Sequence, residues 1–148
     1  MDELINLLKG IEMFAGLSDQ QLAKLAAIFE EKVYRSDDVL FSQGDEGDRI
    51  YVVCDGFVEI IVETDQAPGG RTLVNLGPGQ VVGEMALVDQ GTRSATVRVA
   101  TDATIINSTS RQKFENLCET DTAIGYRIMR NIAADLSFKL RHRNLEER

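Results

Sequence analysis

The sequence has little of several residue types on which common functions depend. A single histidine, His142, leaves too few nitrogen ligands for a multi-histidine metal centre, although carboxylate sites for hard cations stay open. No apolar run approaches the roughly 20 residues needed to cross a bilayer. The opening MDELINLLKG carries acidic side chains where a signal peptide needs basic ones. We therefore expect a cytoplasmic protein with no metal, no cofactor and no membrane partner.

Positive charge is also scarce. Lysine and arginine total 16 against 24 aspartates and glutamates, a formal net charge of −8, which disfavours nucleic acid as a partner. The two cysteines, Cys54 and Cys118, lack a CxxC spacing, which predicts reduced core thiols. The chain has 148 residues, of which 43% are hydrophobic and 27% are charged. This length and composition are typical of one globular domain.

Helical periodicity marks the two ends of the chain. Apolar residues recur at helical spacing between residues 3 and 31, which predicts two short helices, and Ser18 followed by Gln21 predicts a capping box at the start of the second. After residue 110 a short helical segment is followed by a strict four-residue repeat, which predicts a long terminal helix. The repeat consists of Ile124, Ile128, Ile132, Leu136 and Leu140.

The apolar surface of this terminal helix is wider than one stripe, because Tyr126, Met129, Ala133 and Phe138 lie beside the repeat. Two explanations stay open. Either the helix packs on its own domain, or part of it forms a dimer interface.

The middle of the chain, from about residue 32 to 109, is predicted to be β structure. Nine of the twelve glycines fall between Gly44 and Gly91, and they separate short runs rich in valine, isoleucine, tyrosine and phenylalanine. Eight strands are expected, at 31–35, 38–42, 49–54, 57–63, 71–76, 80–82, 94–99 and 103–109, and eight short strands suggest a closed roll or a sandwich. Asp55-Gly56 predicts a tight type I′ hairpin between the third and fourth strands, and further turns are expected at 44–47, 67–70 and 77–79.

One segment carries residues suited to binding a phosphate. It consists of GQVVGEMAL at 79–87, followed after a short loop by RSATV at 93–97. Gly83 would let the backbone approach a ligand, and residues 84–87 can form one helical turn whose N–H groups point at an anion. Arg93 offers a planar cationic fork that matches the two exocyclic oxygens of a cyclic phosphate, and Ser94 can add a hydroxyl and an N–H.

Glu84 fits this arrangement only if it has a donor of its own, because a carboxylate repels a phosphate. A ribose 2′-hydroxyl would supply that donor. The acidity of the chain does not forbid an anionic ligand: a guanidinium about 4 Å away contributes roughly 4 kcal/mol, whereas distant screened charges oppose it by a few tenths. The alternative is that Gly83-Glu84 is an ordinary turn and Arg93 a solvated surface residue.

At these residues the chain resembles the cyclic nucleotide-binding domain family of catabolite-activator-type regulators, cyclic-nucleotide-dependent kinases and gated channels. The stretches FSQGD at 41–45 and GDRIYVV at 47–53 extend the resemblance. It implies one domain over 1–148, mainly β: an eight-stranded antiparallel, jelly-roll-like β-roll at about 32–109. Short helices at about 2–31 and a long helix within about 110–146 would flank it.

The resemblance also implies the site. Glu84 would bind the ribose hydroxyl and Arg93 the cyclic phosphate. The pocket would be completed by Val82, Gly83, Met85, Ala86, Ser94 and Ala95.

Three departures from the family pattern matter. Val82 stands where many members have phenylalanine, a change that removes no polar contact. The stretch 137–140 gives no clear match to residues that contact the base, so cAMP and cGMP both stay open, with cAMP favoured. Regulators of this type continue into a helix-turn-helix, for which the sequence ending at Arg148 leaves no residues, so no nucleic-acid partner is expected.

The expected function is therefore a cyclic-nucleotide sensor that signals through its C-terminal helix to a second subunit or to a separate effector protein. A ligand-free dimerising interaction module with the same fold is the alternative. An enzyme is not expected, because the sequence offers no Ser-His or Cys-His pair.

Overall fold

The computed structural model describes residues 2–88 and 91–146, with side chains as far as residue 143. Arg148, the last residue of the sequence, lies outside this range. The chain divides into two compact units, one made of Met1–Ala27 with Glu115–Arg148 and the other of Ile28–Phe114. The expectation that all of 1–148 forms one domain stays a prediction.

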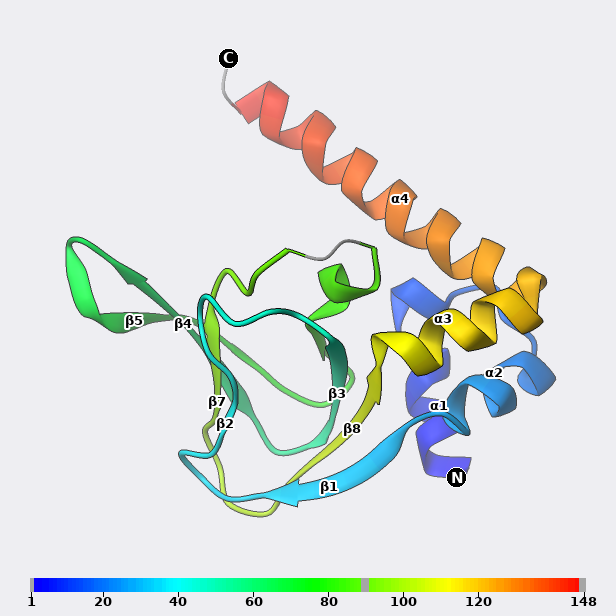
Figure 1. Cartoon of the computed structure of the whole chain (residues 1–148), viewed down its shortest axis with the longest axis horizontal. Helices are drawn as coiled ribbons and strands as arrows, with labels where there is room; N and C mark the ends of the chain where they lie inside the picture. The colour runs from blue at the N-terminus through cyan, green and yellow to red at the C-terminus, as the bar shows by residue number, and fades with distance from the viewer. Residues whose placement is uncertain (1, 89–90, 147–148) are drawn as a thin grey trace. The chain divides into compact units, whose positions relative to one another are not determined.

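The second unit is an antiparallel β-roll (Figure 1). Its described residues form eight strands in two four-stranded sheets, ordered β1-β8-β3-β6 and β2-β7-β4-β5. The strands are β1 Glu30–Tyr34, β2 Val39–Phe41, β3 Arg49–Asp55, β4 Val58–Thr64, β5 Ala67–Leu76, β6 Val81–Val82, β7 Thr96–Val99 and β8 Thr104–Ser110. The predicted fold class is confirmed.

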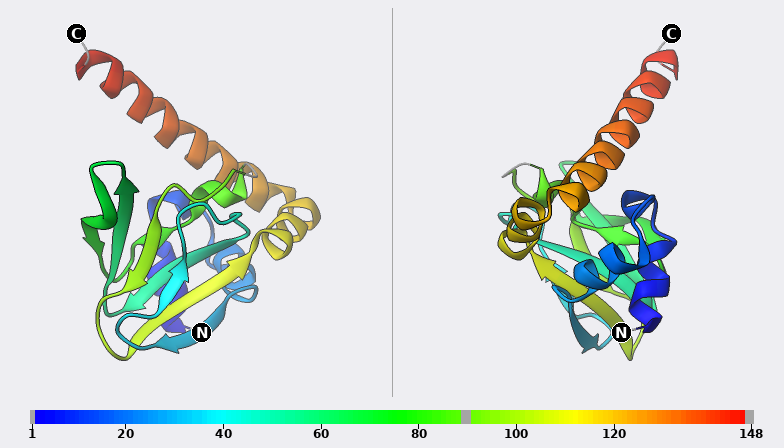
Figure 2. Two further views of the ribbon diagram at one scale, coloured as in Figure 1. Left: turned by 60° about the vertical axis from the view of Figure 1, so that its left-hand side comes forward. Right: turned by 90° about the vertical axis from the view of Figure 1, so that its right-hand side faces the viewer.

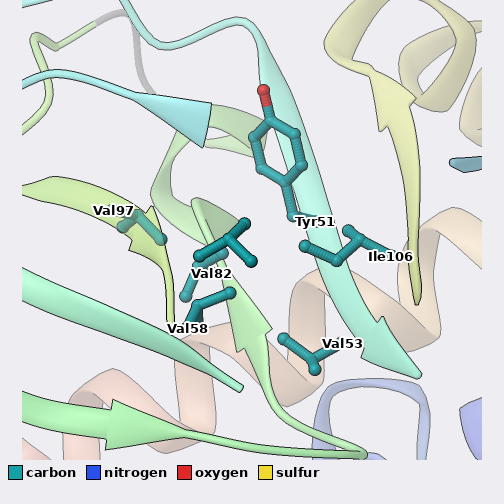
Figure 3. Close-up of a cluster of buried hydrophobic side chains, with 7 residues drawn as sticks. Tyr51, Val53, Val58, Val82, Val97 and Ile106 are labelled. Atoms are coloured by element: carbon teal, nitrogen blue, oxygen red, sulfur yellow. The ribbon is translucent and has the colours of Figure 1, made fainter. Parts of the chain in front are cut away.

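The two sheets share one apolar core (Figure 3). One sheet contributes Tyr51 and Val53 from β3, Val82 from β6 and Ile106 from β8, and the other contributes Val58 from β4 with Val97 and Val99 from β7. Within a strand these residues are two apart, because alternate side chains point to the same face. Burying each such side chain contributes about 1.5–3 kcal/mol, so this layer is the main source of stability in the roll.

The predicted hairpin at Asp55-Gly56 is wrong. β3 pairs with β6 and β8, whereas β4 pairs with β5 and β7, so the chain passes from one sheet to the other at this point. A type I′ turn needs positive φ at both central residues, and only Gly56 has it, at +86°. The sequence pattern predicted the bend correctly but not the partners of the two strands.

The turn predicted at 67–70 is also wrong, because these residues belong to β5. The chain reverses at 65–66 instead, and Thr64 pairs with Ala67. Pro68 is compatible with β5 because that strand lies at the edge of its sheet, where a missing N–H leaves no neighbour unpaired. The turn predicted at 77–79 is present, and Gln80 N donates to Gly77 O at 3.1 Å.

The first unit is helical. It contains α1 Asp2–Lys9, the 3-10 helix η1 Glu12–Phe14, α2 Asp19–Ala26 and α4 Thr122–Glu146, while α3 Arg111–Thr120 joins the two units. The capping box at the start of α2 is confirmed, since Gln21 N donates to Ser18 Oγ at 3.2 Å and Ser18 N to Gln21 Oε1 at 2.9 Å. None of the described helices has both the length and the apolarity to span a bilayer.

The long helix α4 runs without a break (Figure 2). Its first part is tied to η1, because the Asn131 amide donates to Met13 O at 3.0 Å and to Ala15 O at 2.9 Å. The first three residues of the apolar repeat, Ile124, Ile128 and Ile132, are buried. Toward the end of the helix the repeat becomes exposed to solvent, with Leu140 59% exposed. The second half of α4 therefore carries apolar side chains that the described structure leaves in solvent.

Cys54 lies in β3 and Cys118 in α3. Both are free and half-buried rather than fully buried. Desolvation raises the pKa of each thiol above its ordinary value, which keeps both in the neutral, weakly reactive form.

We expect Gly56→Ala to lower the free energy of unfolding by about 3 kcal/mol. An alanine there would have a strained backbone, because φ is positive, and its methyl group would also overlap a neighbouring side chain. The new Cβ would overlap Thr104 Oγ1 and lie 2.9 Å from Thr101 Oγ1. Gly44→Ala is the matched control, since Gly44 has φ +92° but no atom within 4 Å of its Cβ position, and it should cost only about 1 kcal/mol. Urea unfolding measures both; equal losses would contradict the account of this crossing point.

Candidate ligand-binding site

A cavity of about 330 Å³ opens within the roll unit, in the size range of small-molecule sites. All eight residues expected from the sequence line it: Val82, Gly83, Glu84, Met85, Ala86, Arg93, Ser94 and Ala95. The structure thus brings together the two halves of the candidate segment, 82–86 and 93–95.

Other lining residues were not predicted as part of the site. They are Phe41, Gly47, Ile60, Leu76, Val81, Gly91, Thr92 and Val97. Ile60 and Val97 are cross-strand partners in β4 and β7, so strand alternation could have indicated their shared face once the pairing was known. No local sequence signal could have shown that this face borders a cavity.

Gly83 makes the sharp turn that starts one wall of the cavity. It follows β6, has φ +85° and caps the 3-10 helix η2, Glu84–Leu87, whose buried Ala86 and Leu87 anchor the turn in the roll. A Cβ at Gly83 would lie 2.7 Å from Arg93 Nη1 and 2.8 Å from Arg49 O. Only glycine fits this position, for both its conformation and its space.

Arg93 is buried, with 8% of its surface exposed. Its Nη2 donates to Arg49 O at 2.7 Å, and its guanidinium carbon lies 4.0 Å from the centroid of the Phe41 ring. Its backbone is fixed as well, because Arg93 N donates to Asp45 O at 2.6 Å and Gly44 N donates to Arg93 O at 2.8 Å. The alternative in which Arg93 is a solvated surface residue is therefore wrong.

Burial lowers the pKa of this guanidinium. Desolvation holds the pKa of Arg93 below its ordinary value, and the acidic groups nearby offset only part of that change; they are Tyr51, Asp48, Asp45 and Glu84. The group remains cationic. Its Nε is buried and has no hydrogen-bond partner among the described residues. A buried donor without an acceptor costs about 1–3 kcal/mol, a penalty that an anion reaching the Nε would remove.

The cavity is lined by both polar and apolar side chains. Besides Arg93, the polar ones are Glu84, half-buried as the first residue of η2, and the exposed Thr92 and Ser94. Ile60, Leu76 and Val97 provide an apolar wall. Such a site can accept a ligand with a compact anionic end, a hydroxyl group and a flat apolar end.

Comparison with known proteins agrees with this geometry. Residues 31–121 match the family model described as "Cyclic nucleotide-binding domain", a segment that contains all eight candidate residues. The chain is 33% identical over 139 residues to the cyclic AMP receptor protein of Thermus thermophilus, covering 94% of this chain and 62% of that protein. It therefore spans less than two thirds of the length of that relative.

Many solved structures have a similar fold. The N-terminal domain of a transcriptional regulator from Streptomyces coelicolor superimposes with a TM-score of 0.84 at 28% identity, covering 92% of this chain and 94% of that one. The regulatory domain of Toxoplasma gondii PKA, solved with cAMP, superimposes with a TM-score of 0.71 at 26% identity, covering 78% of this chain and 43% of that one.

Arg93 should contribute little to the stability of the unliganded protein, since its hydrogen bond to Arg49 O and its contact with Phe41 only offset the cost of its burial. We expect Arg93→Met, which keeps the side chain's length and apolar stem, to leave the free energy of unfolding unchanged or to raise it by about 1 kcal/mol. Ile106→Ala, in the core, should lower it by about 3 kcal/mol in the same urea titration. A loss for Arg93→Met as large as that for Ile106→Ala would show that Arg93 is a structural residue.

Proposed function

Because the chain belongs to the cyclic nucleotide-binding domain family, we propose that its cavity binds a cyclic nucleotide, cAMP in preference to cGMP. The observation that carries the proposal is the buried guanidinium of Arg93, whose Nε has no partner among the described residues. A cyclic phosphate has two exocyclic oxygens, and a guanidinium fork can donate to both in one plane. The ligand would supply the acceptor that the described residues do not provide.

Glu84 gives the proposal its second contact. It is the first residue of η2 and lines the same cavity as Arg93. An ionised carboxylate accepts hydrogen bonds but donates none, so beside a phosphate it needs a hydroxyl from the ligand. The ribose 2′-hydroxyl is adjacent to the cyclic phosphate and meets this need, which favours a ribonucleotide over a deoxyribonucleotide.

The preference for cAMP rests on the relatives. The protein from Thermus thermophilus is named for cyclic AMP, and the Toxoplasma gondii domain was solved with cAMP. The apolar wall of Ile60, Leu76 and Val97 accepts the face of either purine, so it supports a purine without selecting one. A titration with both nucleotides decides the point.

The sensor role requires that binding changes something outside the cavity. We propose that α4 transmits the change to a second copy of the chain or to a separate effector protein. Tyr126, Phe138 and Leu140 of α4 are each about 60% exposed, and such apolar side chains are typical of contact surfaces. Ligand can shift α4 only by binding one of its arrangements more tightly than another.

The rival role, a dimerising module that binds no ligand, is disfavoured by the same guanidinium. A scaffold would gain nothing from a buried, partly unpaired charge, because an apolar residue of similar size would pack there at lower cost. Retaining such a residue at the expense of stability is typical of functional sites.

Isothermal titration calorimetry with cAMP tests the phosphate contact. We expect Arg93→Met to weaken binding by about a hundredfold or more, since a charged hydrogen-bonding partner in a desolvated site is lost. Arg98→Met is the matched control, because Arg98 lies on β7 and does not line the cavity; its Nε donates to Glu59 Oε1 at 2.6 Å. The Arg98→Met variant should bind cAMP with unchanged affinity. Unaltered binding in Arg93→Met would sink the proposal.

The sugar contact is tested with 2′-deoxy-cAMP. The unsubstituted protein should bind cAMP at least about tenfold more tightly than the deoxy analogue, as expected for a hydrogen bond to a carboxylate. In Glu84→Ala this preference should disappear, with the two ligands bound equally. If Glu84→Ala keeps the full preference, another group recognises the hydroxyl.

A further inference from the structure

The aromatic ring at the end of β2 holds the guanidinium of Arg93 in its orientation. We propose that Phe41 is a positioning residue for nucleotide binding: it contributes to affinity by fixing the plane of the Arg93 fork rather than by forming part of the apolar wall. This inference rests on the proposed function, since it concerns the same site.

The contact between Phe41 and Arg93 is close and partly desolvated. The guanidinium carbon lies 4.0 Å from the ring centroid, well inside the distance of about 6 Å at which a cation is attracted to an aromatic face. Arg93 is buried and Phe41 half-buried, and removal from water strengthens such an interaction. A planar guanidinium also stacks on a ring, which a lysine ammonium cannot do.

The ring is itself held in place. Phe41 packs against Tyr51, with ring centroids 5.8 Å apart and an angle of 35° between the rings. Tyr51 is buried in the core of the roll, and its hydroxyl lies 3.4 Å from Leu40 O. Arg93, Phe41 and Tyr51 thus form a chain of contacts from the cavity into the core.

Two glycines leave room for the guanidinium beside this ring. A Cβ at Gly47 would lie 3.2 Å from Arg93 Cζ, and one at Gly83 would lie 2.7 Å from Arg93 Nη1. Among the described residues, the guanidinium makes one hydrogen bond, from Nη2 to Arg49 O at 2.7 Å. One such bond does not fix the plane of the fork, because the group can still turn about it.

The plane matters because a two-point contact with a phosphate is directional. Both N–H groups must point at oxygens at once, so a fork that tilts loses one of the two bonds. An aliphatic residue at position 41 would fill similar space without an aromatic face. We therefore expect its cost to be larger in nucleotide affinity than in folding.

The experiment compares variants of the full chain by calorimetry with cAMP. Phe41→Leu and Phe41→Met should weaken binding by about tenfold, the loss expected for a partly buried cation–aromatic contact. Phe41→Tyr, which keeps the ring, should bind within about twofold of the unsubstituted protein. Phe57→Leu is the matched control, because Phe57 is 48% exposed and does not line the cavity. Thermal unfolding without nucleotide checks that each variant is folded.

The outcomes separate this inference from the function on which it rests. Full affinity in Phe41→Leu or Phe41→Met overturns the inference while leaving nucleotide binding intact. An equal loss in Phe41→Tyr and Phe41→Leu also overturns it, because the shape of the side chain rather than its aromatic face would then be what matters. Absence of cAMP and cGMP binding by the unsubstituted protein contradicts the proposed function, and the inference falls with it.

Discussion

The site depends on one buried cation whose interactions are incomplete. Arg93 is covered by the roll, donates to one backbone carbonyl and stacks on Phe41, yet its Nε has no acceptor among the described residues. Burying a charge in this way is expensive unless it is paired. The surrounding structure holds the charge in place through the core that fixes Tyr51. Glycines at positions 47 and 83 leave room for it, since a Cβ there would lie 3.2 Å and 2.7 Å from guanidinium atoms.

The residues around Arg93 come from both sheets of the roll. Phe41 ends β2 in one sheet, whereas Arg49, which supplies the accepting carbonyl, begins β3 in the other. The segment between them turns at Gly44 and hydrogen-bonds to the backbone of Arg93, while η2 follows directly from β6. Residues far apart in the sequence therefore meet around one guanidinium. A site assembled in this way is as rigid as the two sheets that carry it, which is what a directional contact with a phosphate requires.

The features that the sequence predicted well are local ones. The capping box of α2 depends on residues three apart, and the positions of most strands follow from short apolar runs between turn residues, although β5 begins earlier than expected. The candidate segment was also recognisable, because Gly83, Glu84 and Arg93 combine residue types that suit an anion and a hydroxyl. One error is a turn placed too late, because Pro68 lies in an edge strand and the chain reverses just before it. The other concerns partners distant in sequence, because Asp55-Gly56 joins two sheets rather than two paired strands. The role of Phe41 was missed for the same reason, since only the folded chain brings its ring to Arg93.

The central claim is tested most directly by NMR observation of the Arg93 side-chain Nε–H, assigned by its loss in Arg93→Met. The account predicts that cAMP shifts this signal strongly downfield and slows its exchange with water, because a phosphate oxygen provides the acceptor that the Nε lacks. An Arg93 Nε–H signal that stays unchanged at saturating cAMP, while the nucleotide is bound, would contradict the account.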